Sequence, residues 1–181
     1  MLYLFLAEGF EEVEALTAVD LLRRAGLELK TVSINDSIEV TGAHNIMVKA
    51  DCVFKDADMD KVRMLILPGG NPGWKNLNKC KALTDELEKA ANNDKYIAAI
   101  CGAPYILGTR GLLKGKRACC YPGMENHLEG ALTNSEEVNV DGKFITSRGV
   151  GTAIPFSLAI IKELLGSQKA DEIAASIVYN A

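Results

Sequence analysis

The chain has 181 residues, of which 48% are hydrophobic and 24% charged, and its formal net charge is −4. These values fit a single domain over residues 1–181 with one sizeable core. Because Lys and Arg do not cluster and the apolar runs are only strand-sized, the sequence disfavours nucleic acid and membranes as partners.

Apolar runs alternate with segments of helical periodicity along the chain. The runs predict strands at residues 2–7, 27–34, 64–67, 96–100 and 117–121, with a small excursion at 38–50. The periodic segments predict helices at residues 11–25, around 80–91, after residue 101, and at 154–165 and 170–179. Two short apolar runs on either side of Asp141-Gly142 predict a hairpin.

This alternation predicts an α/β fold. We expect a flavodoxin-like three-layer sandwich, with a mostly parallel sheet and helices on both faces. In such sheets, ligands bind outside the carboxyl ends of the strands. The loops predicted to lie there are residues 8–14, 68–73, 101–104 and 121–127.

The stretch "YIAAICGAPYIL" (residues 96–107) ends an apolar strand on Cys101 and begins a helix almost at once. Small residues flank the bend, as in a nucleophile elbow, where strand and helix approach too closely for larger side chains. Unpaired N–H groups at a helix N-terminus favour a thiolate, which is the reactive form of cysteine. We therefore predict that Cys101 is a nucleophile; the alternative is a buried thiol packed as a small hydrophobic residue.

Two further loops offer partners for this thiol. Free N–H groups on Gly70 and Gly102 predict an oxyanion hole, although Pro-Gly-Gly is also common in plain turns. Glu14 has apolar neighbours, so burial would raise its pKa and let a protonated carboxyl donate a hydrogen bond to the thiolate. The other acidic residues of this loop are expected to be solvated partners of the helix dipole: Glu8, Glu11 and Glu12.

The five cysteines include no CxxC pair, and the chain has only two histidines. This argues against a disulfide framework and against a zinc site, so we predict no metal and expect a reducing, cytoplasmic location. His44 has no evident partner in the sequence.

Four stretches resemble the ThiJ/PfpI family, in particular its DJ-one (parkinsonism-associated deglycase) branch, and together they cover almost the whole chain: "AEGFEEVEAL", "LPGGNPG", "IAAICGAP" and "ITSRGVGT". The resemblance implies that Cys101 is the nucleophile, that Glu14 is its carboxyl partner, and that the amides of Gly70 and Gly102 line the site. It implies that Arg148 lies in a loop near the pocket and the subunit contact. It also implies a homodimer that uses no cofactor.

Two positions depart from the family pattern. Many members carry a His-Pro pair after the strand that follows the elbow, where this chain has Tyr121-Pro122. Tyr121 cannot act as a base near neutral pH. His127, later in the same loop, is a candidate replacement, although a solvated loop histidine is the simpler interpretation. Val150 stands where a proline is frequent, which implies an altered pocket wall.

These residues leave three functions open. We favour a cofactor-free glyoxalase or deglycase that acts on small 2-oxoaldehydes such as methylglyoxal, or on their adducts, with Cys101 as nucleophile and Glu14 as proton shuttle. The second is a redox sensor or redox-gated chaperone that acts through oxidation of Cys101. A cysteine peptidase is less favoured, because it requires the missing strand-end histidine.

Overall fold

The computed structural model describes residues 1–179. The strands of its main sheet are β1 (Leu2–Leu6), β2 (Leu29–Ser33), β5 (Cys52–Val53), β6 (Met64–Leu67), β7 (Tyr96–Ile100), β10 (Val138–Asp141) and β11 (Phe144–Ser147). Two small two-stranded sheets pair β3 (Glu39–Thr41) with β4 (Met47–Lys49) and β8 (Arg117–Ala118) with β9 (Leu132–Thr133). The helices are α1 (Glu12–Arg24), α2 (Gly73–Lys79), α3 (Lys81–Asn92), α4 (Pro104–Gly108), α5 (Ala153–Leu165) and α6 (Ser167–Ser176). Short 3-10 turns span Phe54–Asp56, Met59–Lys61, Glu125–His127 and Val150–Thr152.

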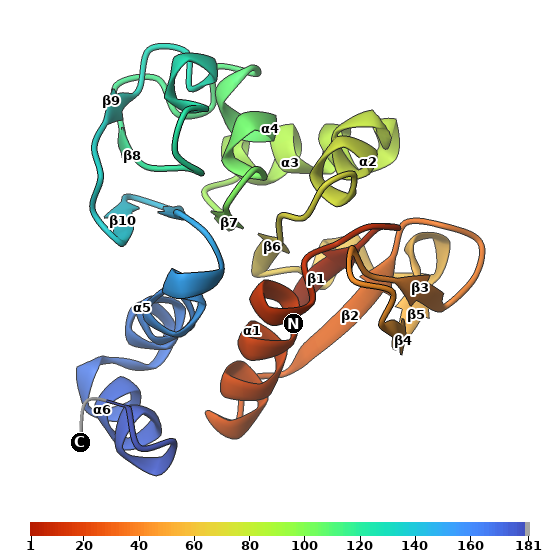
Figure 1. Cartoon of the computed structure of the whole chain (residues 1–181), viewed down its shortest axis with the longest axis horizontal. Coiled ribbons are helices and arrows are strands. Elements are labelled where there is room, and N and C mark those ends of the chain that lie inside the picture. The colour runs from red at the N-terminus through yellow and green to blue at the C-terminus, as the bar shows by residue number, and fades with distance from the viewer. Residues whose placement is uncertain (180–181) are drawn as a thin grey trace.

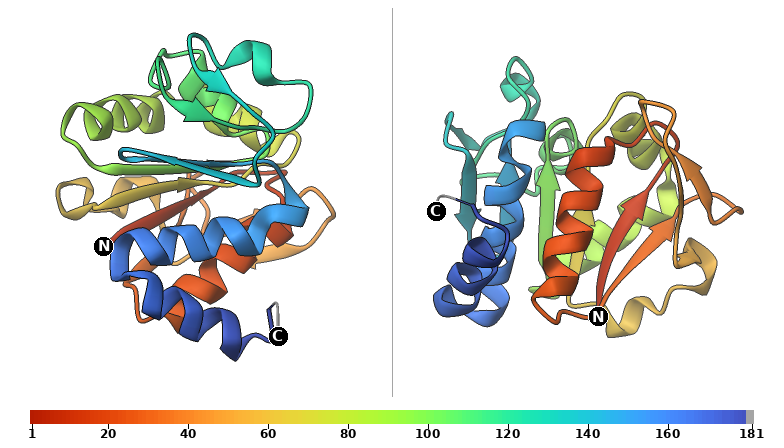
Figure 2. Two further views of the ribbon diagram at one scale, coloured as in Figure 1. Left: turned by 90° about the vertical axis from the view of Figure 1, so that its left-hand side faces the viewer. Right: turned by 60° about the horizontal axis from the view of Figure 1, so that its bottom comes forward.

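The main sheet has seven strands in the order β10-β11-β7-β6-β1-β2-β5 (Figure 1). Neighbouring strands run parallel, except that β10 and β11 form an antiparallel hairpin at one edge. Figure 2 shows the sheet between two helical layers, with α1, α5 and α6 on one face and α2, α3 and α4 on the other. The predicted three-layer sandwich is confirmed.

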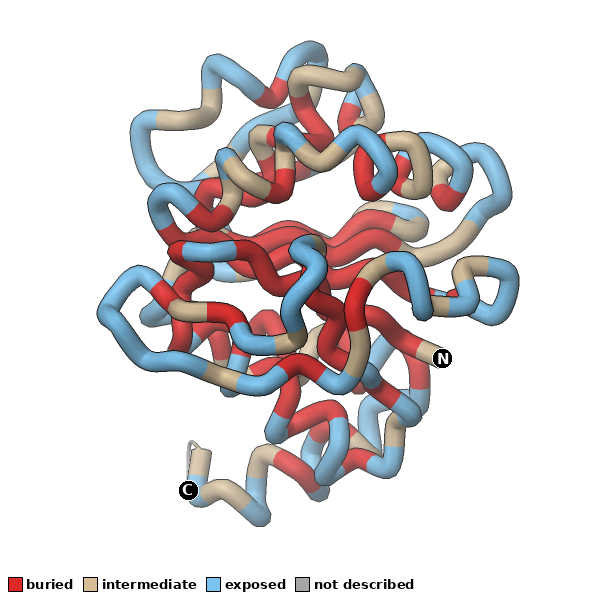
Figure 3. Tube along the Cα trace, turned by 90° about the vertical axis from the view of Figure 1, so that its right-hand side faces the viewer, coloured by how far each residue is buried: buried red, intermediate tan, exposed pale blue. Residues whose placement is uncertain are grey.

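The central strands are apolar throughout because each is covered on both faces. In β1, Leu2, Leu4 and Leu6 pack toward α1 and α5, whereas Tyr3 and Phe5 pack toward α3 and α4. Figure 3 shows the strands as the most continuously buried part of the molecule. This rigid centre fixes the loops at the strand ends.

The strand predicted at residues 117–121 is wrong beyond Ala118. Beyond Ala118, the backbone N–H groups of residues 119–121 do not form strand-to-strand hydrogen bonds. The Cys119 N–H donates to the Thr146 side chain (3.0 Å), and the Tyr121 N–H donates to the Cys101 carbonyl (2.8 Å). The short β8 therefore stays apart from the main sheet. The loop that follows is bonded directly to the elbow.

Other differences concern element boundaries. The helical pattern around residues 80–91 corresponds to α3, and a separate helix, α2, precedes it without having been predicted. The edge strand β5 was also not predicted, and the last helix lies over Ser167–Ser176 instead of residues 170–179. Within residues 1–179, no helix has both the length and the apolar character needed to cross a bilayer.

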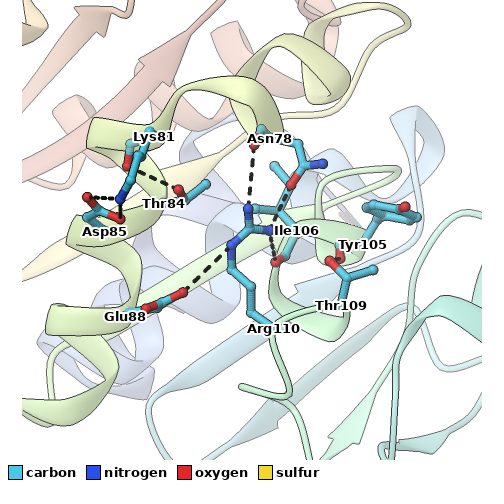
Figure 4. A network of polar contacts seen from close by, with 9 residues as sticks. All are labelled: Asn78, Lys81, Thr84, Asp85, Glu88, Tyr105, Ile106, Thr109 and Arg110. Atoms are coloured by element: carbon cyan, nitrogen blue, oxygen red, sulfur yellow. Dashed lines mark hydrogen bonds and ion pairs between the residues drawn. The ribbon is translucent and has the colours of Figure 1, made fainter.

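Arg110, just after α4, holds that short helix in place (Figure 4). Its guanidinium donates to the Asn78 side chain at the end of α2 (2.7 Å) and to the Ile106 carbonyl (2.8 Å). Its Nε lies 4.0 Å from the Glu88 carboxylate of α3. Because α4 begins three residues after Cys101, this network also supports the predicted nucleophile.

Candidate active site

Cys101 lies at a sharp bend between β7 and α4. Its φ is +64°, in the left-handed region that non-glycine residues seldom adopt. The bend is held on both sides: the Cys101 N–H donates to the Ser147 carbonyl of β11 (3.0 Å), and its carbonyl accepts from Tyr121. Such a strained strand-to-helix turn is the geometry predicted for a nucleophile elbow.

Glu14 approaches the same point from α1. Glu11 caps the helix, and its Oε2 accepts from the Glu14 N–H (2.7 Å). The Glu14 side chain is 1% exposed, and its Oε2 accepts from the Gly69 N–H (2.8 Å). Its Oε1 is buried and has no hydrogen-bond partner among residues 1–179. A buried carboxyl oxygen without a partner is costly when ionised, so this carboxyl favours a proton or a ligand.

Burial and charge couple the two groups. Burial raises the pKa of Glu14 to about 7; the Cys101 thiol and the Gly69 N–H lower it, and the Glu11 carboxylate raises it. Burial and the charge of an ionised Glu14 raise the pKa of Cys101 to about 12, whereas the N–H groups of Gly102 and Gly70 lower it. The N–H groups at the helix terminus therefore favour the thiolate, as predicted, but burial and an ionised Glu14 outweigh them. A proton on Glu14 removes the opposing charge and lets its O–H face the sulfur.

The glycines of residues 68–70 bring the second loop close to this pair. A Cβ on Gly69 would lie 2.6 Å from Cys101 Cβ and 2.7 Å from Glu14 Oε2, so only glycine fits there. Gly70 has φ +90° and lies directly against the backbone of residues 9–11. These close approaches let the N–H groups of Gly70 and Gly102 act on one sulfur.

A cavity of about 650 Å³ opens over the thiol. The residues that line it are Glu11, Glu14, His44, Gly70, Asn71, Trp74, Lys75, Cys101, Gly102, Tyr121, Met124 and Val150. The structure thus brings together five predicted site residues, namely Cys101, Glu14, Gly70, Gly102 and Tyr121. Val150, the residue in the place of the family's proline, is part of the wall.

Two predicted residues lie outside this cavity lining. His127 is exposed, and its ring packs at a tilt against that of Tyr105 (4.9 Å between centroids). The Arg148 guanidinium donates to the Ser135 carbonyl (3.3 Å). Neither side chain is among the groups that surround the thiol.

Sequence reasoning missed three features of the site. Glu11 and Glu12 were predicted to be solvated, but both are buried, since Glu11 caps α1 and Glu12 binds His44. His44 does have a partner and does line the cavity. Trp74 packs over Gly102, where an added Cβ would lie 2.6 Å from the indole. The position of Trp74 directly after "PGGNPG" could have indicated from the sequence that it lies at the site. No sequence pattern indicates the contact between residues 12 and 44.

Within residues 1–179, one cluster has donor atoms near enough to hold a metal ion: Glu11, Glu12 and His44, whose atoms lie within 4.8 Å of one another. His44 Nδ1 and a Glu12 carboxylate oxygen already contact each other at 2.7 Å, so this contact engages one ligand atom of each residue.

Comparisons with known proteins show which family and fold this chain shares. The model of the DJ-1/PfpI family matches residues 1–163. The protein DJ-1 homolog B of Arabidopsis thaliana is 38% identical over 174 residues, which cover 95% of this chain but only 40% of that protein. A deglycase of Pyrococcus abyssi is 32% identical over 161 residues, covering 87% of this chain and 95% of that protein. The structure of oxidized Toxoplasma gondii DJ-1 is similar with a TM-score of 0.95 and 34% identity, covering 99% of this chain and 98% of that one.

Proposed function

Because this chain belongs to the DJ-1/PfpI family, we propose that it is a cofactor-free glyoxalase or deglycase that acts on small 2-oxoaldehydes or their amine adducts. One observation carries the proposal: a cysteine at a strained elbow shares a cavity with a buried carboxyl whose Oε1 is unpartnered. The deglycase name of the Pyrococcus abyssi relative supports the same class of reaction.

The chemistry as far as the thioester needs only these groups. The Cys101 thiolate forms a bond to the aldehyde carbon, and the resulting oxyanion is stabilised by the N–H groups of Gly70 and Gly102 before it takes the Glu14 proton. Ionised Glu14 then removes the proton from that carbon and returns it to the neighbouring carbon through an enediol, while the hydroxyl proton on the former aldehyde oxygen passes to the ketone oxygen. The aldehyde carbon is oxidised while the ketone carbon is reduced, so no external oxidant is required. Water then cleaves the thioester and releases a 2-hydroxy acid.

A second candidate function is redox sensing through Cys101. The Toxoplasma gondii relative was solved as an oxidized protein. The N–H groups of Gly70 and Gly102 and a protonated Glu14 would also stabilise a cysteine sulfinate. Mild peroxide followed by intact-mass measurement separates the two functions, because selective oxidation at Cys101 without turnover of aldehyde favours the sensor.

We also propose that the protein works as a homodimer. Four apolar side chains at the start of α1 and around β4 are 39–61% exposed: Val13, Leu16, Ile46 and Met47. A contiguous exposed apolar patch marks a surface that another protein covers, and we propose that these four side chains form one. The turn that carries Ile46 is bonded to the start of α1, next to the cavity.

The decisive experiment is methylglyoxal consumption without glutathione, comparing the wild type with Cys101→Ser and Glu14→Gln. We expect Cys101→Ser to abolish turnover and Glu14→Gln to lower kcat by about 10²–10⁴-fold, the usual contribution of a general acid–base group. His127→Gln is the matched control and should behave as wild type, because His127 does not line the cavity. Undiminished turnover in Cys101→Ser would rule out the mechanism.

A further inference from the structure

His44 enters the cavity from a part of the chain that the proposed mechanism does not use. It lies in the turn between β3 and β4 and lines the same cavity as Cys101 and Glu14. The chain has only two histidines, and the other, His127, packs against Tyr105 and is not part of the cavity lining. His44 is therefore the imidazole that is available to the site.

A carboxylate fixes the orientation of this ring. Glu12 accepts from the His44 backbone N–H through one oxygen (2.7 Å) and contacts Nδ1 through the other (2.7 Å). Glu12 is itself buried. A carboxylate on Nδ1 holds the proton on that nitrogen, so the lone pair of the neutral ring is on Nε2. Within residues 1–179, Nε2 makes no hydrogen bond.

The charges around the ring make it a stronger base than a free histidine. The hydrogen bond and charge of Glu12 raise the pKa of His44, and Glu11, whose Oε1 lies 3.8 Å from Nδ1, adds to the rise. Lys75 of α2 and the Glu14–Cys101 pair also face the cavity. The His44 side chain is 69% exposed, so its proton exchanges directly with solvent.

The last step of the proposed reaction lacks a base. Glu14 is enclosed and serves the proton transfer between the two carbons of the substrate. Tyr121 occupies the place of the family's strand-end histidine and carries a phenol in place of an imidazole. Hydrolysis of a thioester nevertheless needs a group that takes a proton from the attacking water.

We propose that His44 is that group: a carboxylate-oriented general base that activates the water which hydrolyses the Cys101 thioester. The inference rests on the function proposed above. Water gives one proton to Nε2 while its oxygen bonds to the acyl carbon. The carbon–sulfur bond breaks, and the sulfur leaves with the electron pair. The imidazolium then returns its proton to solvent, and no other reactant is consumed.

The test compares His44→Gln, its matched control His127→Gln and wild type in methylglyoxal turnover, with intact-mass measurement after acid quench. We expect kcat of His44→Gln to fall about 10²-fold, with accumulation of a Cys101 adduct that has the mass of one substrate and is released by hydroxylamine, as a thioester is. Added imidazole should restore turnover to His44→Ala, and His127→Gln should match wild type.

Three results would overturn the inference. One is wild-type kcat in His44→Gln. Another is loss of turnover in the His44 variants without accumulated thioester and without rescue by imidazole. That result would show that His44 only stabilises the turn between β3 and β4. The third is a rate of thioester decay in the wild type that does not rise with pH through the His44 pKa. NMR measures that pKa directly in His127→Gln, because His44 is then the one histidine left in the chain.

The same data separate this inference from the proposed function. If the wild type neither consumes methylglyoxal nor forms a thioester, the proposed function fails and the role of His44 fails with it. If the wild type turns over and His44→Gln matches it, only the role of His44 fails.

Discussion

At the scale of the residue, the buried Glu14 carboxyl makes stability depend on pH. Its pKa is raised by burial to about 7 from an ordinary value of 4.5. Because the pKa of Glu14 is higher in the folded protein than in the unfolded chain, the unfolded chain ionises first as pH rises. The stabilising contribution of this carboxyl is therefore full below pH 4.5 and is lost as pH rises through 7. The free energy of unfolding should therefore fall by roughly 2–3 kcal/mol over this range through this one group.

Glu14→Gln is the variant that isolates this contribution, because its amide does not titrate. We expect the difference in unfolding free energy, wild type minus Glu14→Gln, to decrease between pH 4.5 and 8 in denaturant titrations. A difference that stays constant, or increases with pH, would show that the wild-type carboxyl is ionised at no cost in the folded protein.

A second prediction at this scale concerns Gly69. A methyl group there would meet both Cys101 and Glu14 at distances below 2.8 Å, so Gly69→Ala must push the two apart. We expect kcat to fall by about 10²-fold, as small misplacements of reacting groups do. Gly151→Ala is the matched control, since an added Cβ there meets nothing within 4 Å, and its activity should be unchanged.

At the scale of the element, α4 depends on Arg110. The helix has one to two turns, too few to be stable alone. Removing the guanidinium in Arg110→Ala leaves the Asn78 and Ile106 acceptors without this donor, and we expect a loss of about 1–2 kcal/mol in unfolding free energy. Arg24→Ala, which breaks only an exposed pair with Asp20, should cost clearly less, because solvent screens exposed ion pairs. Equal losses in the two variants would contradict a structural role for Arg110.

Elements also show how far the sequence could predict this fold. Strands buried on both faces, such as β6 and β7, were recognisable because their apolar runs have sharp ends. The strand at residues 117–121 was over-extended because Cys119 and Tyr121 bond to Thr146 and Cys101, and no local pattern encodes such distant partners. α2 escaped prediction because its glycine, tryptophan and lysine residues make no clear apolar stripe over seven residues.

The same distinction applies to the site. Cys101 and the glycine loops were predictable because elbows and close turns need particular residues at fixed local spacing. His44 was not, because its pairing with Glu12 joins positions 32 residues apart. The burial of Glu11 and Glu12 follows from that pairing and from capping, whereas their composition alone indicates a solvated helix start.

At the scale of the whole molecule, we predict a dimer that buries the apolar surface of Val13, Leu16, Ile46 and Met47. Light scattering after size-exclusion chromatography should give twice the chain mass for the wild type and the monomer mass for Leu16→Glu. Leu132→Glu, at an exposed apolar residue of β9, is the control and should remain dimeric. A wild-type monomer at micromolar concentration would refute the dimer.

The chain's only tryptophan lies over Gly102 and lines the same cavity as Cys101. Its ring also contacts that of Tyr105, with 4.8 Å between the ring centroids. The protein therefore carries its own fluorophore at the reacting centre. Tryptophan emission should respond to binding, acylation or oxidation of Cys101, so that stopped-flow fluorescence can resolve single steps of the proposed cycle without a label.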